Sequence, residues 1–282
     1  MNSNVVSLIP KIQSVESIKD YRPIVVANFK FKIISKIIAD RLAIVAARII
    51  SPNQYGFVQV RHIHDCIGIA FEAINMLSKK VRKGNVVYKV DIHKEFDTLS
   101  WKFLLLVLTR FSFHPLLVGG ISTILHLVVL SIKINGSLVG FFPCRGVRQG
   151  DSLSPFLFCL AEEVLSRGIY KLVNDKKILH MTSSQGYVTP SHILYVDDIF
   201  VFCRADNKSL RNLSVFLKIY GDFSGQYVNN YKSSFFTMDN FARFVTKIQR
   251  LLSCSHGCLP LTYLGVPIFF WCSKVSISST FG

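Results

Sequence analysis

The chain has few acidic residues for its size: 17 Asp and Glu stand against 33 Lys and Arg, and the formal net charge is +16. A folded domain with such an excess of positive charge favours a polyanionic partner, either nucleic acid or an anionic membrane surface. A merely basic surface is the alternative, and we favour nucleic acid. Half of the residues are hydrophobic, which argues against general disorder and allows a sizeable core.

The chain also lacks a paired cysteine framework. Its seven cysteines are an odd number, and no secretory signal is visible at the N-terminus. We therefore interpret them as reduced thiols of an intracellular protein, in the nucleus or the cytoplasm. Cys254 and Cys258 flank His256, but no second pair of ligands follows at a useful distance, so the spacing does not favour a structural zinc site.

No segment has the pattern of a membrane span, and we expect no membrane partner. The most apolar tract, 116–132, is short for a span of about 20 residues and contains Gly119, Gly120 and His126. We interpret it as a buried helix that runs into a strand. The chain shows no internal repeat and no long low-complexity linker, and its 282 residues suit one large domain or two subdomains that share a core.

Helices and strands are predicted to alternate irregularly, with residues 1–20 polar and irregular. Asn135-Gly136 predicts a hairpin turn, and Ser154-Pro155 predicts the N-cap and first residue of a helix. These elements fit an α+β domain in which helices cover one face of an antiparallel sheet. Strands are expected at 22–26, 86–92, 128–134, 138–142, 192–195, 199–202 and 233–238, and helices at 28–48, 63–80, 100–111, from 115, 154–173, 210–222 and 242–252.

Three aspartates stand where predicted strands end. Asp91 closes an apolar strand, while Asp197 and Asp198 form the tip of a hairpin between two apolar runs. Adjacent carboxylates repel each other and need water or a cation. Hard oxygen ligands at a sheet edge suit Mg²⁺, and two such ions can promote in-line phosphoryl displacement. Taken singly, however, an Asp-Asp pair is usually only a polar turn, and a strand-ending Asp is usually only a cap.

The segments around these aspartates form an ordered set that resembles a known family. In order and spacing they resemble the palm motifs of non-LTR (LINE-type) retrotransposon reverse transcriptases, especially those of plants. Segments upstream of residue 62 resemble the fingers motifs of the same family. The palm segments are Lys89-Val90-Asp91 with Phe96-Asp97, Arg148 to Pro155, Tyr195 to Asp198, Ser224-Gly225-Gln226 with Lys232-Ser233, and Tyr263-Leu264-Gly265; the fingers segments are Leu8 to Lys11, Tyr21 to Ile24, the helix at 32–42, and Ser51 to Gln54 with Arg61.

The resemblance implies the palm and fingers of a right-hand polymerase. Residues 1–85 would be a fingers-like region, and residues 86–282 the palm with motifs A to E and fingers insertions. A thumb would be largely missing, and the two parts would form one reverse transcriptase domain. The implied function is an RNA-directed DNA polymerase core that acts in retrotransposition. It would extend a DNA primer on an RNA or DNA template from dNTPs by two-metal-ion nucleotidyl transfer, with two Mg²⁺ ions or with Mn²⁺.

The resemblance also assigns residues to the chemistry. Asp91 and Asp197 match the two metal-binding aspartates, and Asp198 matches their supporting neighbour. Lys232 matches a lysine thought to assist the departure of pyrophosphate as a general acid. Phe96 matches the aromatic residue that stacks under the incoming sugar and excludes a 2′-hydroxyl, although alone it would be interpreted as a core residue.

Further matches concern the template and the nascent pair. Arg148, Gln149 and Gly150 match the loop that contacts both, where arginine can fork onto phosphate and glycine permits close backbone approach. Tyr195 completes the expected substrate-binding set.

The remaining matches lie on the fingers helix and at the primer. Lys36 and Arg41 fit triphosphate contacts and a solvated helix face equally well. Tyr263, Leu264 and Gly265 match the primer-gripping hairpin.

Some features depart from the family pattern and leave alternatives open. His93 and Glu95 are unusual between Asp91 and Phe96, and the endonuclease that such elements carry is absent from this chain. A truncated relic or a non-catalytic nucleic-acid-binding descendant is therefore an alternative. An RNA-directed RNA polymerase would share the arrangement of palm carboxylates, but Phe96 argues against it because RNA polymerases need room for the 2′-hydroxyl. The residues of the fingers motifs resemble those of plant LINE-type elements, which argues against a group II intron maturase.

Overall fold

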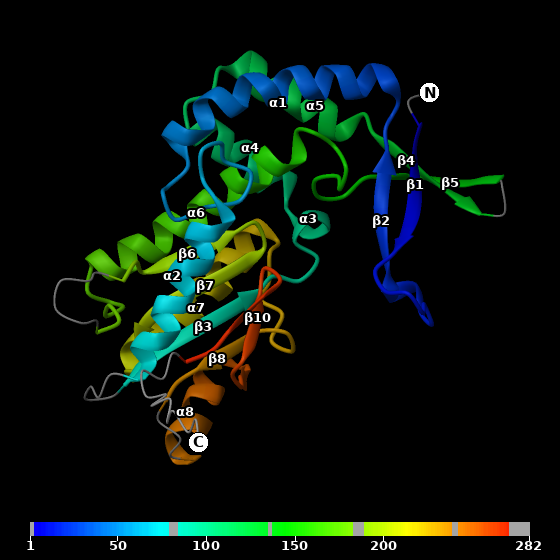
Figure 1. Cartoon of the computed structure of the whole chain (residues 1–282). Coiled ribbons are helices and arrows are strands. Elements are labelled where there is room, and N and C mark those ends of the chain that lie inside the picture. The colour runs from blue at the N-terminus through cyan, green and yellow to red at the C-terminus, as the bar shows by residue number, and fades with distance from the viewer. Residues whose placement is uncertain (1–2, 79–83, 135–136, 183–188, 239–241, 271–282) are drawn as a thin grey trace, which may run out of the picture.

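A computed structural model describes residues 3–78, 84–134, 137–182, 189–238 and 242–270. A five-stranded sheet, a layer of helices and a separate four-stranded sheet make up the fold (Figure 1). The expected hairpin turn at Asn135-Gly136 and the tail 271–282 lie outside the described residues.

The five-stranded sheet has the order β6-β7-β3-β8-β9. Its neighbours run antiparallel except for the short parallel pairing of β8 with β9, so the predicted antiparallel sheet is confirmed. The central pairing sets Asp91 directly opposite Asp198. The strands are β3 (Asn85–Asp91), β6 (His192–Tyr195), β7 (Asp198–Arg204), β8 (Ser234–Phe236) and β9 (Ser255–His256).

Side chains alternate between the two faces of this sheet. Tyr88 and Val90 of β3 belong to a buried cluster with α6 (Ser154–Asn174), α7 (Asn207–Ser224) and α8 (Ala242–Leu252). Helices therefore cover one face, as the sequence predicts.

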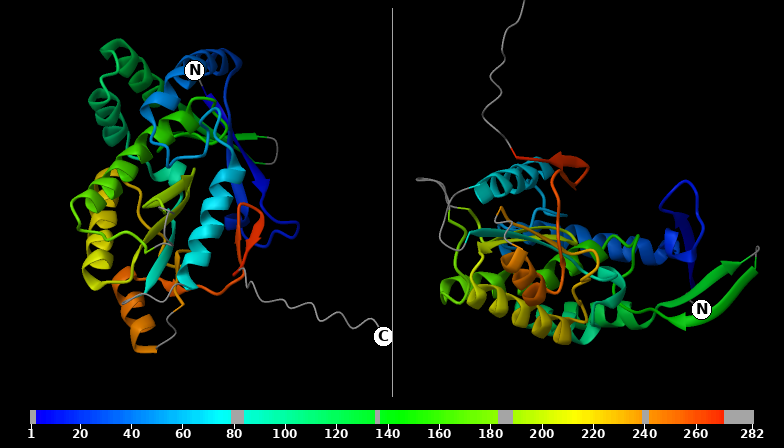
Figure 2. Two further views of the ribbon diagram at one scale, coloured as in Figure 1. Left: turned by 60° about the vertical axis from the view of Figure 1, so that its left-hand side comes forward. Right: turned by 90° about the horizontal axis from the view of Figure 1, so that it is seen from below.

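The opposite face of the sheet is only partly covered. Val87 packs there with α2 (Ile63–Asn75) and with the small hairpin of β10 (Leu261–Tyr263) and β11 (Val266–Ile268) (Figure 2). By strand alternation this is also the face of Lys89 and Asp91, at the end of β3.

A helical core adjoins the sheet. The first half of α6 packs there with α1 (Phe29–Ile49), α4 (Trp101–Arg110) and α5 (Pro115–His126). Side chains cap two of these helices: Asn28 accepts from the Lys30 amide and Ser100 accepts from the Phe103 amide. Shorter elements are α3 (Glu95–Thr98) and the 3₁₀ turns η1 (Ile18–Asp20) and η2 (Met76–Ser78).

The predicted start of α6 is wrong by one residue. Leu153, and not Ser154, occupies the N-cap position and makes no side-chain cap. Instead Asp151 Oδ1 accepts from the Leu153 amide at 3.3 Å. The acceptor, Asp151, lies in the preceding loop, outside the Ser154-Pro155 step on which the prediction is based.

The four-stranded sheet projects from the helical layer as an arm (Figure 1). Its order is β2-β1-β4-β5, and β1 runs parallel to β4. The expectation of irregular structure at residues 1–20 is wrong for β1, because its backbone groups pair with β2 on one side and β4 on the other. Its strands are β1 (Ser3–Pro10), β2 (Tyr21–Val26), β4 (Val129–Ile134) and β5 (Ser137–Pro143).

The apolar tract 116–132 forms most of α5 and the start of β4. Within the described parts of the chain, no helix has both the length and the hydropathy required to cross a membrane.

Candidate active site

Three carboxylates gather at one end of the central strands. Asp91 is the last residue of β3 and Asp198 is the first residue of β7, directly opposite it. Asp197 lies in the turn between β6 and β7. Residues directly opposite in an antiparallel pair have Cβ atoms about 5 Å apart, so their side chains are neighbours. The sequence-predicted aspartates are thus brought together by strand register.

The environment of these carboxylates opposes their ionisation. Burial raises the pKa of Asp91, and nearby Asp198 raises it further, against lowering by Lys232 and a hydrogen bond from Asn229. Burial also raises the pKa of Asp197, with Asp198 and Asp91 adding to it. The site therefore concentrates negative charge that a cation would stabilise.

The described protein cations offer little compensation. Lys89 Nζ lies 3.7 Å from Asp198 Oδ1, and both side chains are partly exposed. Lys232 is exposed on the loop before β8, and its charge lowers the pKa of Asp91. Lys232 therefore lies within electrostatic range of Asp91, and the general-acid role expected of it stays a prediction.

Glu95 adds a fourth carboxyl group to this region. It opens α3, immediately after Lys94, whose φ is +48°. Burial, followed by the charges of Asp197 and Asp91, raises its pKa to about 7. The sequence marks Glu95 as unusual but gives it no role. The missed property is that this carboxyl lies within the field of Asp197 and Asp91, which helps to raise its pKa.

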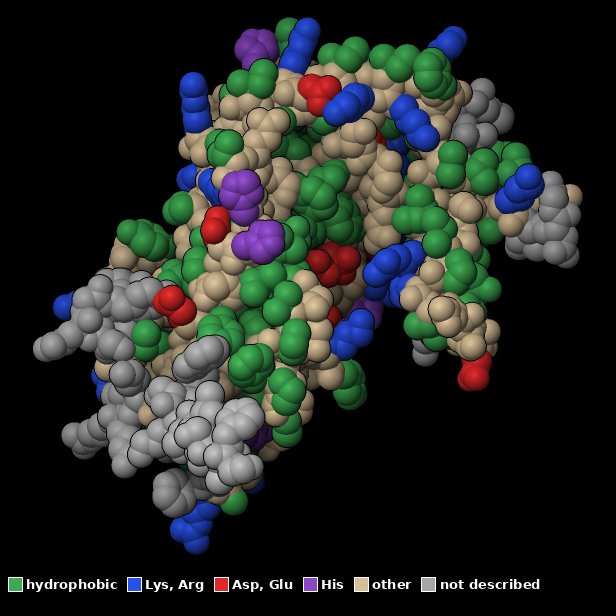
Figure 3. Space-filling model, in the orientation of Figure 1, with side chains coloured by type: hydrophobic (Ala, Val, Ile, Leu, Met, Phe, Trp, Pro, Cys, Tyr) green, Lys and Arg blue, Asp and Glu red, His purple; other side chains and the backbone are tan. Residues whose placement is uncertain are grey.

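The donor set fits a hard divalent cation, since it consists of carboxylate oxygens in a partly buried, acidic setting. Within the residues that the structure describes, no three His, Cys, Asp or Glu side chains already converge as a metal cluster. Figure 3 shows acidic side chains at the bottom of a hollow that has Lys and Arg side chains along one side.

Phe96 follows Glu95 in α3 and is half-buried. Its ring stacks on that of Phe158 in α6, with centroids 4.8 Å apart and planes inclined by 20°. The Phe96 carbonyl accepts from the Val147 amide at 2.7 Å. A β-carbon on Gly146 would lie 2.0 Å from the same carbonyl, so only glycine allows this approach. The ring position is therefore set by packing from two sides.

Arg148 is buried against protein groups in this structure, and the phosphate contact expected of it stays a prediction. It is 5% exposed, its Nη2 lies 2.6 Å from Asp151 Oδ2, and its guanidinium stacks 4.2 Å from the ring centre of Phe31. The neighbouring Gln149 and Gly150 remain at the surface. The Gln149 carbonyl accepts from the Val25 amide at 3.1 Å, and Gly150, at φ +95°, lies against Val25. The loop is thereby attached to β2.

Tyr263 is also buried, whereas the resemblance gave it a primer contact. Its hydroxyl lies 3.0 Å from Cys66 Sγ of α2, so it anchors the β10–β11 hairpin to that helix. The turn of that hairpin, Leu264 and Gly265, has φ values of +49° and +82° and is the part that reaches solvent.

Three further predicted residues lie apart from one another. Tyr195 ends β6 and packs, half-buried, against the cluster around α2. Lys36 pairs with Asp40 at 2.7 Å on an exposed part of α1, and Arg41 is exposed on the same helix. For Lys36 the structure shows the solvated helix contact that the sequence left open.

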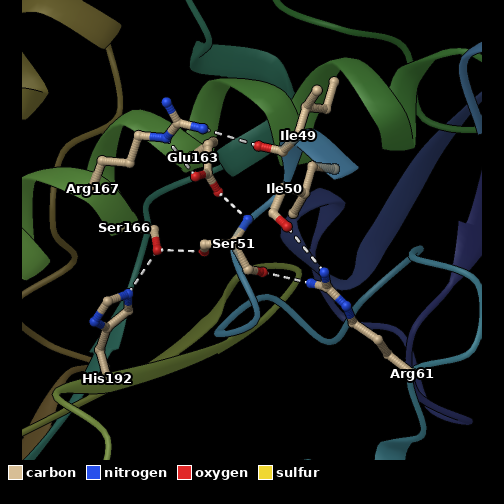
Figure 4. A network of polar contacts seen from close by, with 8 residues as sticks. All are labelled: Ile49, Ile50, Ser51, Arg61, Glu163, Ser166, Arg167 and His192. Atoms are coloured by element: carbon tan, nitrogen blue, oxygen red, sulfur yellow. Dashed lines mark hydrogen bonds and ion pairs between the residues drawn. The ribbon is translucent and has the colours of Figure 1, made fainter. Parts of the chain in front are cut away.

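A buried polar network joins the end of α1 to the palm (Figure 4). Arg61 donates to the carbonyls of Ile50 and Ser51, and Glu163 accepts from the Ser51 amide at 2.8 Å. Serine hydroxyls connect the same residue to the palm strand: Ser51 meets Ser166 at 2.7 Å, and Ser166 meets the imidazole of His192 at 2.7 Å. The loop 50–61 is thus fixed to α6 and β6.

Sequence reasoning missed Glu162 and Glu163 altogether. Both are almost fully buried in α6, at 1% and 2% exposure. Burial raises the pKa of Glu162 well above its ordinary value, and the charge of Asp197 raises it further. Two adjacent glutamates within an apolar helix are a usable signal, because such residues are almost never buried without partners.

Comparisons with known proteins agree with this geometry. Residues 9–268 match the family described as reverse transcriptase (RNA-dependent DNA polymerase). The chain is 29% identical over 235 residues to the transposon TX1 uncharacterized 149 kDa protein of Xenopus laevis, which is 82% of this chain and 17% of that protein. It is 28% identical over 180 residues to the retrovirus-related Pol polyprotein from type-1 retrotransposable element R2 of Popillia japonica, covering 61% of this chain and 25% of that protein.

The chain therefore spans well under half the length of either relative. Among solved structures, apo telomerase from Candida tropicalis superposes with a TM-score of 0.59 at 12% identity, over 85% of this chain and 45% of that one. At this identity the likeness concerns the fold, and it confirms the expected right-hand palm and fingers.

Proposed function

Because the chain belongs to the reverse transcriptase family, we propose that it forms the catalytic core of an RNA-directed DNA polymerase. It would extend a DNA primer on an RNA or DNA template by nucleotidyl transfer from dNTPs. The observation that carries the proposal is the register of β3 and β7, which sets Asp91 opposite Asp198 with Asp197 in the adjoining turn. Its retrotransposon relatives support a role in retrotransposition. The residues of its motifs resemble those of plant elements, which supports a plant source.

Asp91 and Asp197 are the residues that would hold the divalent ions, with Asp198 beside them. Two bound Mg²⁺ ions, or Mn²⁺ in their place, would activate the primer 3′-hydroxyl and stabilise the leaving oxygen. The half-buried carboxylates keep this reaction at the edge of the sheet, where a triphosphate can complete the coordination. Lys232 stands near Asp91 and would donate a proton to the departing pyrophosphate.

Other residues would select and align the substrates. Phe96, held by Phe158, would stack under the incoming sugar and leave no room for a 2′-hydroxyl. Gln149 and Gly150 would face the nascent pair from a loop that the Arg148–Asp151 pair fixes. The turn at Leu264 and Gly265 would contact the primer. The positive net charge would neutralise phosphates along the template–primer duplex.

Primer extension tests this proposal directly. The purified chain should incorporate dTTP on poly(rA)/oligo(dT) in the presence of Mg²⁺, and Asp197→Ala should not. Incorporation no greater than that of Asp197→Ala would refute the enzyme assignment. Incorporation of rNTPs in preference to dNTPs would instead indicate an RNA polymerase, and Phe96→Ala should relax the preference for dNTPs if Phe96 excludes the 2′-hydroxyl.

A further inference from the structure

The turn that carries Asp197 has an unfavourable backbone conformation. Val196 has a φ of +57°, in the left-handed region that L-residues avoid and β-branched residues avoid most. Two-residue hairpin turns normally use Asn or Gly at such positions. Here the sequence places Val196 at such a position, so the local sequence does not favour the turn that the site requires. Contacts from outside the hairpin must stabilise it.

Gln54, from the segment before α2, supplies such a contact. Its side-chain oxygen accepts from the Val196 amide at 3.3 Å and from the Gly56 amide at 2.9 Å. Gln54 is 2% exposed, so no water competes freely for these donors. The hydrogen bond reaches the residue immediately before Asp197. A single amide side chain, that of Gln54, therefore connects the turn that carries Asp197 to the segment before α2.

The backbone of the same segment lies against β6. The Leu194 amide donates to the Asn53 carbonyl at 2.8 Å, and the Tyr55 amide donates to the Leu194 carbonyl at 2.8 Å. A β-carbon on Gly56 would lie 2.5 Å from the Val196 side chain and 2.8 Å from its amide nitrogen. The absence of a side chain at Gly56 is what allows the segment to press directly on the turn.

Glu162 orients the Gln54 amide. Gln54 Nε2 donates to Glu162 Oε2 at 3.2 Å, and this fixes which end of the amide faces Val196. Glu162 is 1% exposed, and its Oε1 has no hydrogen-bond partner among the described residues. A buried glutamate at this point has a cost that apolar residues would avoid, which indicates a specific use for its acceptor oxygen.

The segment is itself held from the fingers side. Arg61 donates to the Gln54 carbonyl as well as to the carbonyls of Ile50 and Ser51. Glu163, the neighbour of Glu162, receives the Ser51 amide and pairs with Arg167 at 2.7 Å (Figure 4). The path from α6 through Gln54 to Val196 thus consists of hydrogen bonds that are buried at Gln54 and part-buried at Val196.

We infer that Gln54 is a positioning residue, oriented by Glu162, that holds the Val196 turn and thereby sets the place of the Asp197 carboxylate. This inference rests on the proposed polymerase function and assigns to the fingers segment a role in the geometry of the metal site. Gln54 touches no reacting atom in this arrangement. Its effect passes through the Val196 backbone.

Substitution of Gln54 by Met tests the inference, because it keeps the side-chain length and removes the acceptor and the donor. The single-turnover rate of primer extension should fall about 10-fold or more, while the KM for dNTP and the affinity for template–primer change little. Asn53→Ala is the matched control. It removes a 2.7 Å hydrogen bond to the His192 carbonyl from the same segment without touching Val196, and it should stay within about 2-fold of the native rate.

A donor–acceptor exchange separates positioning from general stability. In Gln54→Glu the new carboxylate still accepts from both amides, but the Nε2 donor to Glu162 is lost and two carboxyl groups share the buried site, so the rate should fall. In the double variant with Glu162→Gln, the amide donates from the opposite side, and the rate should return to within about 3-fold of the native value. This pair also carries the test if Gln54→Met does not fold. A double variant no faster than Gln54→Glu would contradict the role of Glu162.

Mn²⁺ binding, measured by electron paramagnetic resonance, provides a readout that does not require turnover. Gln54→Met should bind Mn²⁺ about 10-fold more weakly than the native chain, and the exchanged double variant should recover. If the native chain does not extend primers, the proposed function fails while this titration still decides the positioning role. Native-like Mn²⁺ affinity in folded Gln54→Met, or a native extension rate in that variant, would overturn the inference.

Discussion

Two acidic regions of this molecule are built in opposite ways. Asp151 is buried against Arg148 at 2.6 Å, and the guanidinium also stacks on Phe31. At the ends of β3 and β7, Lys89 lies 3.7 Å from Asp198, and Lys232 lowers the pKa of Asp91. The first region is compensated by the protein itself. In the second, burial and like charges still raise the pKa of Asp91 and Asp197, so a bound cation would stabilise the carboxylates.

The difference separates structural charge from functional charge. A compensated buried pair fixes geometry, here the attachment of the 148–151 loop to the fingers. Carboxylates without sufficient counter-charge cost stability and persist where chemistry requires them. The two regions should therefore respond to substitution in opposite ways: one should lose stability, and the other should lose activity.

The largest effect is expected for Asp197→Asn. The amide keeps the shape and removes a negative charge that the fold disfavours, so the free energy of unfolding at neutral pH should stay the same or rise. Primer extension should fall by about 1000-fold, which corresponds to roughly 4 kcal/mol of lost transition-state stabilisation. Chemical denaturation and single-turnover extension measure the two quantities. A marked loss of stability with retained activity would reverse the assignment of the two regions.

Arg148→Met should show the opposite response. It leaves Asp151 buried without its partner, and the free energy of unfolding should drop by about 3–5 kcal/mol. Adding Asp151→Leu should recover most of that loss, because both charges are then gone. Urea denaturation of the two single variants and the double variant forms the cycle. Equal stability of Arg148→Met and the native chain would show that the pair contributes no net stability.

Glu95→Gln tests the acidic region by pH. The pKa of Glu95 is about 7, against an ordinary value of 4.5. The folded chain therefore retains a proton that the unfolded chain has lost, and stability falls as pH rises from about 4.5 to 7. The variant lacks this decline, so its advantage should grow across that window to about 1 kcal/mol, given the partial exposure of the side chain. Thermal melts at several pH values measure it; a constant difference would contradict the assigned environment.

The smallest effect is expected for Lys36→Ala. Its partner Asp40 is exposed, and a surface pair of this spacing contributes about 0.3–0.5 kcal/mol. We expect no more than that change in the free energy of unfolding and little change in the KM for dNTP. A large rise in that KM would instead establish Lys36 as a triphosphate contact.

Much of the fold could be predicted because its signals are local. The cap at Asn28 and the apolar strands on either side of Asp197 depend on neighbouring residues. β1 could not be predicted, because its partners β2 and β4 include a strand more than 100 residues away in the sequence. Strand pairing between distant segments leaves no mark in the local pattern.

The site shows the same division. The aspartates were identified by their motifs, and strand register brings them together as expected. The burial of Arg148 and Tyr263 was not foreseen, because a motif names a residue without indicating which neighbours cover it. Gln54 and Glu162 lie more than 100 residues apart and meet only in the folded chain.

The stability of the chain with and without Mg²⁺ tests most directly whether these carboxylates bind a divalent cation. Thermal melts at neutral pH would compare the native chain with Asp91→Asn/Asp197→Asn in millimolar Mg²⁺ and in chelator. Because a ligand that binds only the folded state raises its stability, the native midpoint should rise with Mg²⁺ while that of the double variant stays constant. An equal rise in both proteins would place the bound cation elsewhere and contradict the account.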